Sequence, residues 1–143
     1  MSDLAKKLIS VACWVLAVII IIAILPFGTI HNVKIDYGSS AKFEPGEVKA
    51  AVRTVLLEFV FFNFGEDLKE LCYDEEWSNR DISFSDFYIA QYGEDNLIVI
   101  KGVYDTGPIK NATLSSNTLY PWCWVLAREG TGSGWKIVSQ GFP

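Results

Sequence analysis

Few side chains in this 143-residue sequence have the chemistry of an active site. His31 is the single histidine, and it lies close to a long apolar run near the N-terminus. Asp86, Asp105, Tyr88 and Tyr104 lie in or beside predicted strands, and they could act as general acids or bases only if their surroundings shifted their pKa values toward neutrality. Solvated carboxylates at strand ends and packed tyrosines are the more ordinary interpretation. The sequence therefore favours a non-catalytic function over an enzyme.

The sequence also lacks the common catalytic and metal-binding motifs. The sequence contains no GxSxG nucleophile elbow, no phosphate-binding P-loop and no cysteine or histidine spacing typical of zinc. The acidic run Asp74-Glu75-Glu76 could hold a cation, but a solvated helix end is the simpler interpretation. We therefore expect no metal and no cofactor.

Two cysteines remain for the folded part of the chain. Cys13 lies inside the apolar run, which leaves Cys72 and Cys123. In a translocated domain this pair could form a disulfide that closes a long loop. The alternative is two buried free thiols, which behave as small apolar side chains. The sequence leaves both alternatives open.

Aromatic side chains are the best candidates for contacts with a ligand. Trp122 and Trp124 lie two residues apart in the predicted strand 119–128, so they share one face of that strand. We expect them to meet the apolar core or to line a pocket, and at least one of them to be largely buried. Tyr88 and Tyr104 are further candidates for the lining of a pocket, because they also lie in predicted strands.

The longest apolar run of the sequence lies near its N-terminus, before the elements that must position these residues. Residues 8–27, LISVACWVLAVIIIIAILPF, contain no charged side chain. Twenty helical residues span about 30 Å, the thickness of the hydrocarbon core of a bilayer. A buried core helix would show a polar face, and a cleaved signal peptide would end in small residues, where this run has Ile24-Leu25-Pro26-Phe27. The sequence favours an uncleaved transmembrane anchor over a cleaved signal.

Charges predict the orientation of this anchor. Lys6 and Lys7 directly precede the run, whereas Lys34 and Lys42 follow it at a distance. The positive-inside rule then predicts a cytoplasmic tail at residues 1–7 and an extracytoplasmic C-terminal domain.

The net charge of −5 argues against a nucleic-acid partner, since an acidic protein repels phosphates.

Beyond the anchor we expect a linker at residues 28–44 and a single domain at residues 45–143. Pro45 suits the first turn of a helix. Apolar residues then recur with helical spacing over the next four turns, at Val48, Ala51, Val52, Val55, Leu56, Phe59 and Val60. A second, shorter helix is predicted at residues 66–73.

From residue 87 onward the pattern changes from helix to strand. Strands are predicted at residues 87–92, 97–105, 119–128 and 135–139, and Gly102 indicates a bulge or bend. Helices followed by antiparallel strands predict an α+β domain, in which two helices pack on a curved antiparallel sheet. A sheet curved around a helix would form a cone with an apolar pocket at its open end.

Two phrases of the sequence resemble nuclear-transport-factor-2-like domains, especially the small secreted or anchored ones of unknown function in Gram-positive bacteria. The first is Trp124-Val125-Leu126-Ala127-Arg128-Glu129, followed after a glycine-rich turn by Gly134-Trp135-Lys136-Ile137-Val138 and Gly141. The second is residues 61–77, FFNFGEDLKELCYDEEW. The resemblance covers residues 45–143 and implies the cone fold. Enzymes of that fold carry an aspartate or a histidine inside the cone, and this domain has no histidine.

The sequence thus predicts a non-catalytic, single-pass protein of the cell membrane. Residues 8–27 contact the lipid bilayer, and the extracytoplasmic domain binds a small ligand or a protein partner. The alternative is an oligomerising scaffold subunit of a membrane assembly of the secretion or conjugation type.

Overall fold

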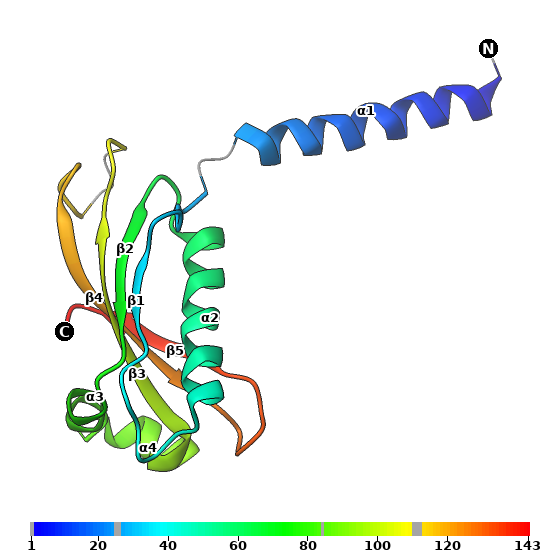
Figure 1. The fold of residues 1–143 in the computed structure, drawn as a ribbon. Helices are drawn as coiled ribbons and strands as arrows, with labels where there is room; N and C mark the ends of the chain where they lie inside the picture. The colour runs from blue at the N-terminus through cyan, green and yellow to red at the C-terminus, as the bar shows by residue number, and fades with distance from the viewer. Residues whose placement is uncertain (1, 25–26, 84, 110–112) are drawn as a thin grey trace.

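The computed structural model describes residues 2–24, 27–83, 85–109 and 113–143. Helix α1 (Asp3–Ile24) stands away from the rest of the chain in Figure 1. Residues 3–23 of α1 are long and apolar enough to cross a membrane, and no part of them is buried in the protein. The same length and composition would also suit a signal sequence. The helix begins before the predicted residue 8 and includes Lys6 and Lys7, while Leu25 and Pro26 lie outside the described residues.

The remaining chain is an α+β domain built on one curved, open sheet of five strands in the order β1-β2-β3-β4-β5. The strands are β1 (Lys34–Asp36), β2 (Asp67–Cys72), β3 (Leu97–Asp105), β4 (Leu119–Ala127) and β5 (Lys136–Gly141). Strands β2 to β5 are antiparallel neighbours, and for β3, β4 and β5 this confirms the predicted antiparallel sheet. Strand β1 runs parallel to β2, so the sheet is mixed rather than purely antiparallel.

The predicted linker at residues 28–44 contributes to the domain. Lys34, Ile35 and Asp36 pair with Glu70, Leu71 and Cys72. A β-strand, a helix and a parallel β-strand follow one another here, because α2 (Pro45–Phe62) connects β1 to β2. Residues 34–36 of the predicted linker thus form an edge strand of the sheet.

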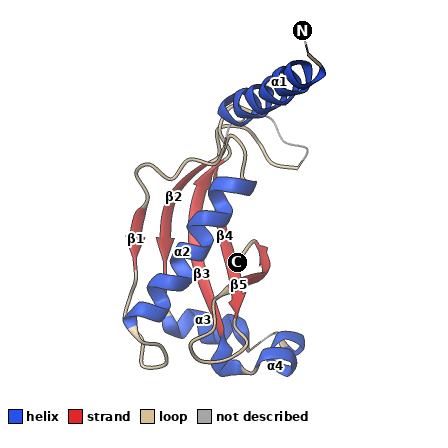
Figure 2. Cartoon of the chain, turned by 90° about the vertical axis from the view of Figure 1, so that its right-hand side faces the viewer, coloured by secondary structure: helices blue, strands red, loops and turns tan. Residues whose placement is uncertain are grey.

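Helix α2 begins at Pro45, as predicted, and it covers one face of the sheet (Figure 2). Its first turn is closed by a capping box, in which the side chains of Glu44 and Glu47 each bond the other residue's backbone N–H. The predicted apolar stripe faces the sheet. The buried residues of α2 are Val48, Ala51, Val52, Val55 and Phe59, with Leu56 partly buried against the same cluster.

The predicted helix at residues 66–73 was wrong, because this segment forms strand β2. Leu68 and Leu71 are both buried against α2, although side chains three apart on a regular strand point to opposite faces. The pairing with β3 explains this, since Leu68 pairs with Tyr104 and Glu70 pairs with Val103, which leaves Lys69 as an extra residue in a bulge. The bulge gives a strand the leucine spacing of a helix.

Two short helices cover the other face of the sheet. Helix α3 (Glu75–Ile82) is capped by Asp74, whose side chain accepts a hydrogen bond from Trp77 N at 2.9 Å. The acidic run at residues 74–76 is thus a helix end, as the simpler interpretation held. Residues 87–92, predicted as a strand, belong to helix α4 (Asp86–Tyr92). A short 3₁₀ helix, η1 (Glu94–Asn96), leads into β3.

Strand β4 separates the two faces as predicted. Trp122, Trp124 and Leu126 point toward α2, whereas Cys123 and Val125 point toward α3 and α4. Gly102 takes part in a regular stretch of pairing between β3 and β4 rather than in a bulge. Close packing explains why a glycine occupies this position, because a Cβ here would lie 2.9 Å from the ring of Trp124 and 2.6 Å from the Glu70 carbonyl oxygen.

Candidate functional site

The two cysteines of the domain are free thiols. Cys72 and Cys123 both pair with Lys101, the former from β2 and the latter from β4, so a whole strand separates them. Two strand spacings amount to roughly 10 Å, which is beyond the Cα separation that a disulfide spans. Burial raises the pKa of both thiols above the ordinary value. The structure therefore has two free thiols, of which Cys123 is buried and Cys72 is partly exposed.

Three of the four predicted ligand-lining residues lie together on the α2 face of the sheet. Trp124 is completely buried, and Tyr104 is buried with the pKa of its hydroxyl raised by burial to about 12. Trp122 is partly exposed, and its ring centroid lies 5.8 Å from that of Tyr104 and 4.9 Å from that of Phe142. Of these three residues, Trp122 is therefore the one that remains accessible to a ligand.

The fourth predicted residue, Tyr88, lies on the opposite side of the sheet. It belongs to α4 and packs against the second cluster, with Ile82, Leu97 and Val99. Its hydroxyl donates a hydrogen bond to the Val138 carbonyl oxygen at 3.0 Å. Val138 is the extra residue of a bulge in β5, because Ser139 pairs with Val125 and Ile137 pairs with Leu126. Tyr88 therefore supports β5 from behind and does not share a pocket with the tryptophans.

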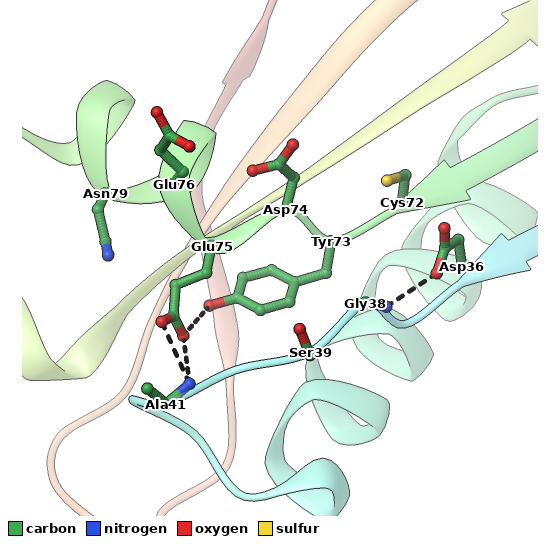
Figure 3. A pocket seen from close by; sticks show the side chains of 10 residues that line it. All are labelled: Asp36, Gly38, Ser39, Ala41, Cys72, Tyr73, Asp74, Glu75, Glu76 and Asn79. Carbon is green, nitrogen blue, oxygen red and sulfur yellow. Dashed lines mark hydrogen bonds between the residues drawn. The ribbon is translucent and has the colours of Figure 1, made fainter.

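An acidic hollow of about 600 Å³ lies between the segment after β1 and the start of α3 (Figure 3). Asp36, Asp74, Glu75 and Glu76 line it together with Asn79. Across the described residues, no group of three or more histidine, cysteine, aspartate or glutamate side chains is arranged to hold a metal ion.

Glu75 has a structural role in this hollow. Figure 3 shows its carboxylate turned toward Ala41, whose N–H donates to both carboxylate oxygens at 3.1 and 3.0 Å. The Ser40 hydroxyl and the Lys42 N–H also donate to Glu75. The bond from Ser40 is the main cause that lowers the pKa of Glu75. The carboxylate is thus saturated by the loop it holds, and it offers little to a ligand.

A second hollow, of about 460 Å³, forms a groove between α2 and β5. Thr54 and Glu58 line it from the helix, and residues 137–140 line it from the strand. Gln140 Nε2 donates to Glu58 Oε1 at 3.1 Å, and Trp122 Nε1 donates to Gln140 Oε1 at 3.3 Å. A chain of polar contacts therefore leads from the partly exposed Trp122 to the groove carboxyl.

The Glu58 carboxyl, at the end of this series of polar contacts, lacks a hydrogen-bond partner for one oxygen and has a raised pKa. Within the described part of the protein, Oε2 of Glu58 and Nε1 of Trp124 are buried and have no hydrogen-bond partner of standard geometry. Burial raises the pKa of Glu58, and the nearby amide of Gln140 and indole N–H of Trp124 oppose that rise. The indole N–H of Trp124 lies close enough to Glu58 to act on its pKa as a hydrogen-bond donor. The Glu58 carboxyl also lines the groove, where a polar group of a ligand can reach it.

The groove can therefore bind rather than catalyse. Glu58 and Gln140 line it and can accept and donate hydrogen bonds, which suits a hydroxyl or an amide as the polar group of a ligand. Glu58 lies three residues after Val55 in the sequence, at the margin of the apolar stripe. That spacing was the available signal. Nothing in the sequence indicated Gln140, because its contact with Glu58 joins residues 82 positions apart.

Comparison of the chain with protein-family models, with curated proteins and with solved structures gives no match.

Proposed function

We propose that this protein is a non-catalytic, membrane-anchored binding protein, whose ligand site is the groove between α2 and β5. Helix α1 crosses the cell membrane once, residues 1–7 lie in the cytoplasm, and the α+β domain lies outside it. The apolar length of α1 and the lysines at its start support this topology.

One observation carries the assignment of the site. The Glu58 carboxyl lines an open groove, and in the described residues its Oε2 and the nearby Trp124 indole N–H are buried without a hydrogen-bond partner of standard geometry. In the acidic hollow Glu75 is saturated by the loop that it holds, although the side-chain oxygen of Asn79 there is also buried without a partner in the described residues. Trp122 lies at the other end of the same polar chain and offers an aromatic ring to an apolar part of the ligand.

The ligand that fits is a small molecule, or a side chain of a protein partner, that carries a hydroxyl or amide next to an apolar group. Its polar group bonds the Glu58 carboxyl in the groove, and its apolar part lies on Trp122. The raised pKa of Glu58 argues against a site that selects cations, because burial disfavours the charged carboxylate.

The test is a thermal-shift screen of neutral hydroxyl- and amide-bearing compounds and peptides against the full-length protein in detergent. The variant Thr54→Trp fills the groove from the helix without removing Glu58. Arg53→Trp adds the same ring one residue earlier, at an exposed position outside the groove, and serves as the matched control. Stabilisation that is lost in Thr54→Trp and kept in Arg53→Trp supports the proposal. Equal stabilisation of both variants, or of none of the proteins, contradicts it.

An oligomerising scaffold subunit is the second candidate function. Strand β5 favours it, since β5 has a neighbour on one side only in the described sheet, and an open edge can pair with another copy. Cross-linking of the full-length protein in membranes distinguishes the two, because the scaffold requires contacts between copies at β5.

The nuclear-transport-factor-2-like relationship is part of this proposal. Support comes from the long helix on a curved sheet and from the phrases at residues 61–77 and 124–141.

A further inference from the structure

The end of the domain next to α1 carries exposed apolar side chains. Phe61 and Phe62 close α2, and Phe64 follows in the turn to β2; all three are about half exposed or more. Ile109 is also exposed and packs over Gly65 from the loop after β3. We call these four residues the terminal apolar patch: Phe61, Phe62, Phe64 and Ile109. Contiguous exposed apolar residues of this kind mark interaction surfaces.

The chain connects this patch to α1 by a very short path. Gly28 is fixed to the domain, because its N–H donates to the Val60 carbonyl oxygen at 3.0 Å and a Cβ here would lie 2.2 Å from the Phe59 carbonyl oxygen. Thr29 then forms a bridge with Asp67. Four residue steps separate Gly28 from Ile24, the last residue of α1, and they span about 14 Å at full extension.

The ring of Phe27 joins the patch to the start of the domain. Its centroid lies 6.3 Å from that of Phe61 and 6.0 Å from that of Phe64. Figure 1 shows α1 leaving the domain beside the C-terminal end of α2. If α1 crosses a bilayer, the terminal apolar patch has to lie within the headgroup region or directly against it, because the connection is too short to hold it farther away.

We propose that the terminal apolar patch is a membrane-contact surface, held in the interface of the same bilayer that α1 crosses. This inference rests on the membrane anchor of the proposed function. Phenylalanine and isoleucine gain free energy in the interfacial region of a bilayer by leaving water. The contact fixes one end of the domain on the lipid and turns the opposite end, with α3 and α4, away from the membrane.

Charges near the patch indicate apolar rather than electrostatic contact. Glu66 accepts a hydrogen bond from the Asn63 amide at 2.6 Å, and Asp67 forms an ion pair with Lys69. These acidic groups do not attract anionic lipid. The patch should therefore contact a bilayer made of zwitterionic phosphatidylcholine alone.

The test uses a photoreactive phenylalanine analogue, benzoyl-phenylalanine, in the full-length protein reconstituted into phosphatidylcholine vesicles. The analogue replaces Phe62, Phe87 or Trp14, one at a time, and each of these side chains is 72% exposed. Phe87 lies on α4 and is the matched control in the domain. Trp14 lies in α1 and reports on the anchor itself.

After irradiation, mass spectrometry should find lipid adducts at positions 14 and 62 in similar yield, and only background at position 87. Adducts at position 14 without adducts at position 62 would overturn the membrane-contact surface and leave the anchor standing. No lipid adduct at position 14 would overturn the anchor. Adducts between protein copies at position 62, in place of lipid adducts, would show that a second copy covers the patch. Equal lipid yields at positions 62 and 87 would show that lipid contact is not selective for the patch. Each of these results would refute the inference.

Discussion

A buried ion pair at the start of α2 allows a quantitative test of the packing. The Arg128 guanidinium lies between two rings, 4.7 Å from the centroid of Trp135 and 5.4 Å from that of Phe43. Its Nε donates to Asn96 Oδ1 at 3.2 Å, and its Nη1 donates to Glu47 Oε1. The side chain of Arg128 is 6% exposed and that of Glu47 is 24% exposed. The substitution Glu47→Gln keeps the shape of the side chain and removes its charge.

We expect Glu47→Gln to lower the free energy of unfolding by about 2–3 kcal/mol. Removing one partner of a fully buried pair costs roughly 3–5 kcal/mol, because the other charge stays buried without compensation. The partial exposure of Glu47 brings the cost below that range. The second carboxylate oxygen accepts the Glu44 N–H at 2.8 Å, and glutamine retains only one acceptor oxygen for both donors.

The pH dependence gives the sign of the effect independently. The hydrogen bond from Arg128 is the main cause that lowers the pKa of Glu47 below its ordinary value of 4.5. A carboxyl with a lowered pKa contributes stability above its unfolded pKa and loses it as the pH falls through the folded pKa. The difference between wild type and Glu47→Gln should therefore be full at neutral pH and shrink below about pH 4.5.

Urea unfolding of the full-length protein in detergent, followed by tryptophan fluorescence, measures both effects. The matched control is Glu129→Gln, since Glu129 also pairs with a cation, Lys136, but both side chains are at least half exposed. An exposed pair contributes about 0–1 kcal/mol, so this variant should unfold close to wild type. Equal losses in the two variants, or a loss for Glu47→Gln that is independent of pH, would refute the reasoning.

Three further predictions follow from single positions. Burial raises the pKa of Glu58 above 4.5, and a carboxyl with a raised pKa makes the stability fall as the pH rises through the folded pKa. In urea unfolding, Glu58→Gln should therefore be more stable than wild type at neutral pH and as stable as wild type at about pH 4. A Glu58→Gln variant that is less stable than wild type at neutral pH would contradict this. Val55→Asp buries an unpaired charge at a fully buried position and should abolish the cooperative thermal transition, whereas the exposed Arg53→Asp should keep it. Gly28→Ala should destabilise the domain by about 1–3 kcal/mol through overpacking, because the added Cβ meets a backbone oxygen. Gly46→Ala is the control and should not destabilise the domain, because the space around Gly46 is open. Equal melting temperatures of the two variants would argue against close packing around Gly28.

Local sequence predicted the elements whose stability comes from their own residues. The apolar run determines α1 by composition, and Pro45 with a regular apolar stripe determines the start of α2 and its buried face. Strands β3 and β4 were predicted with nearly their observed bounds, because β-branched and aromatic residues crowd there. The division of Trp124 from Cys123 across β4 followed from the period of two.

Only the tertiary structure decided the elements that depend on a distant partner. Strand β1 has three residues, and its pairing with β2 becomes possible only after α2 has crossed the sheet. Residues 86–92 contain aromatic residues typical of strands, yet Tyr88, Ile89 and Tyr92 have the spacing that packs a helix onto the second cluster. For strand β2, the bulge at Lys69 let Leu68 and Leu71 imitate a helical pattern.

The candidate site divides in the same way. The sequence offered Trp122 as one of four candidate contact residues, since its aromatic ring and its strand face are local properties. Glu58 and Gln140 come from a helix and a strand that are far apart in the chain, and the donor that faces Glu58 comes from a third element. The pattern of residues determined which faces are apolar, but the distance between a carboxyl and its partner is set by how α2 lies on the sheet, and that geometry is decided by the packing of the whole core.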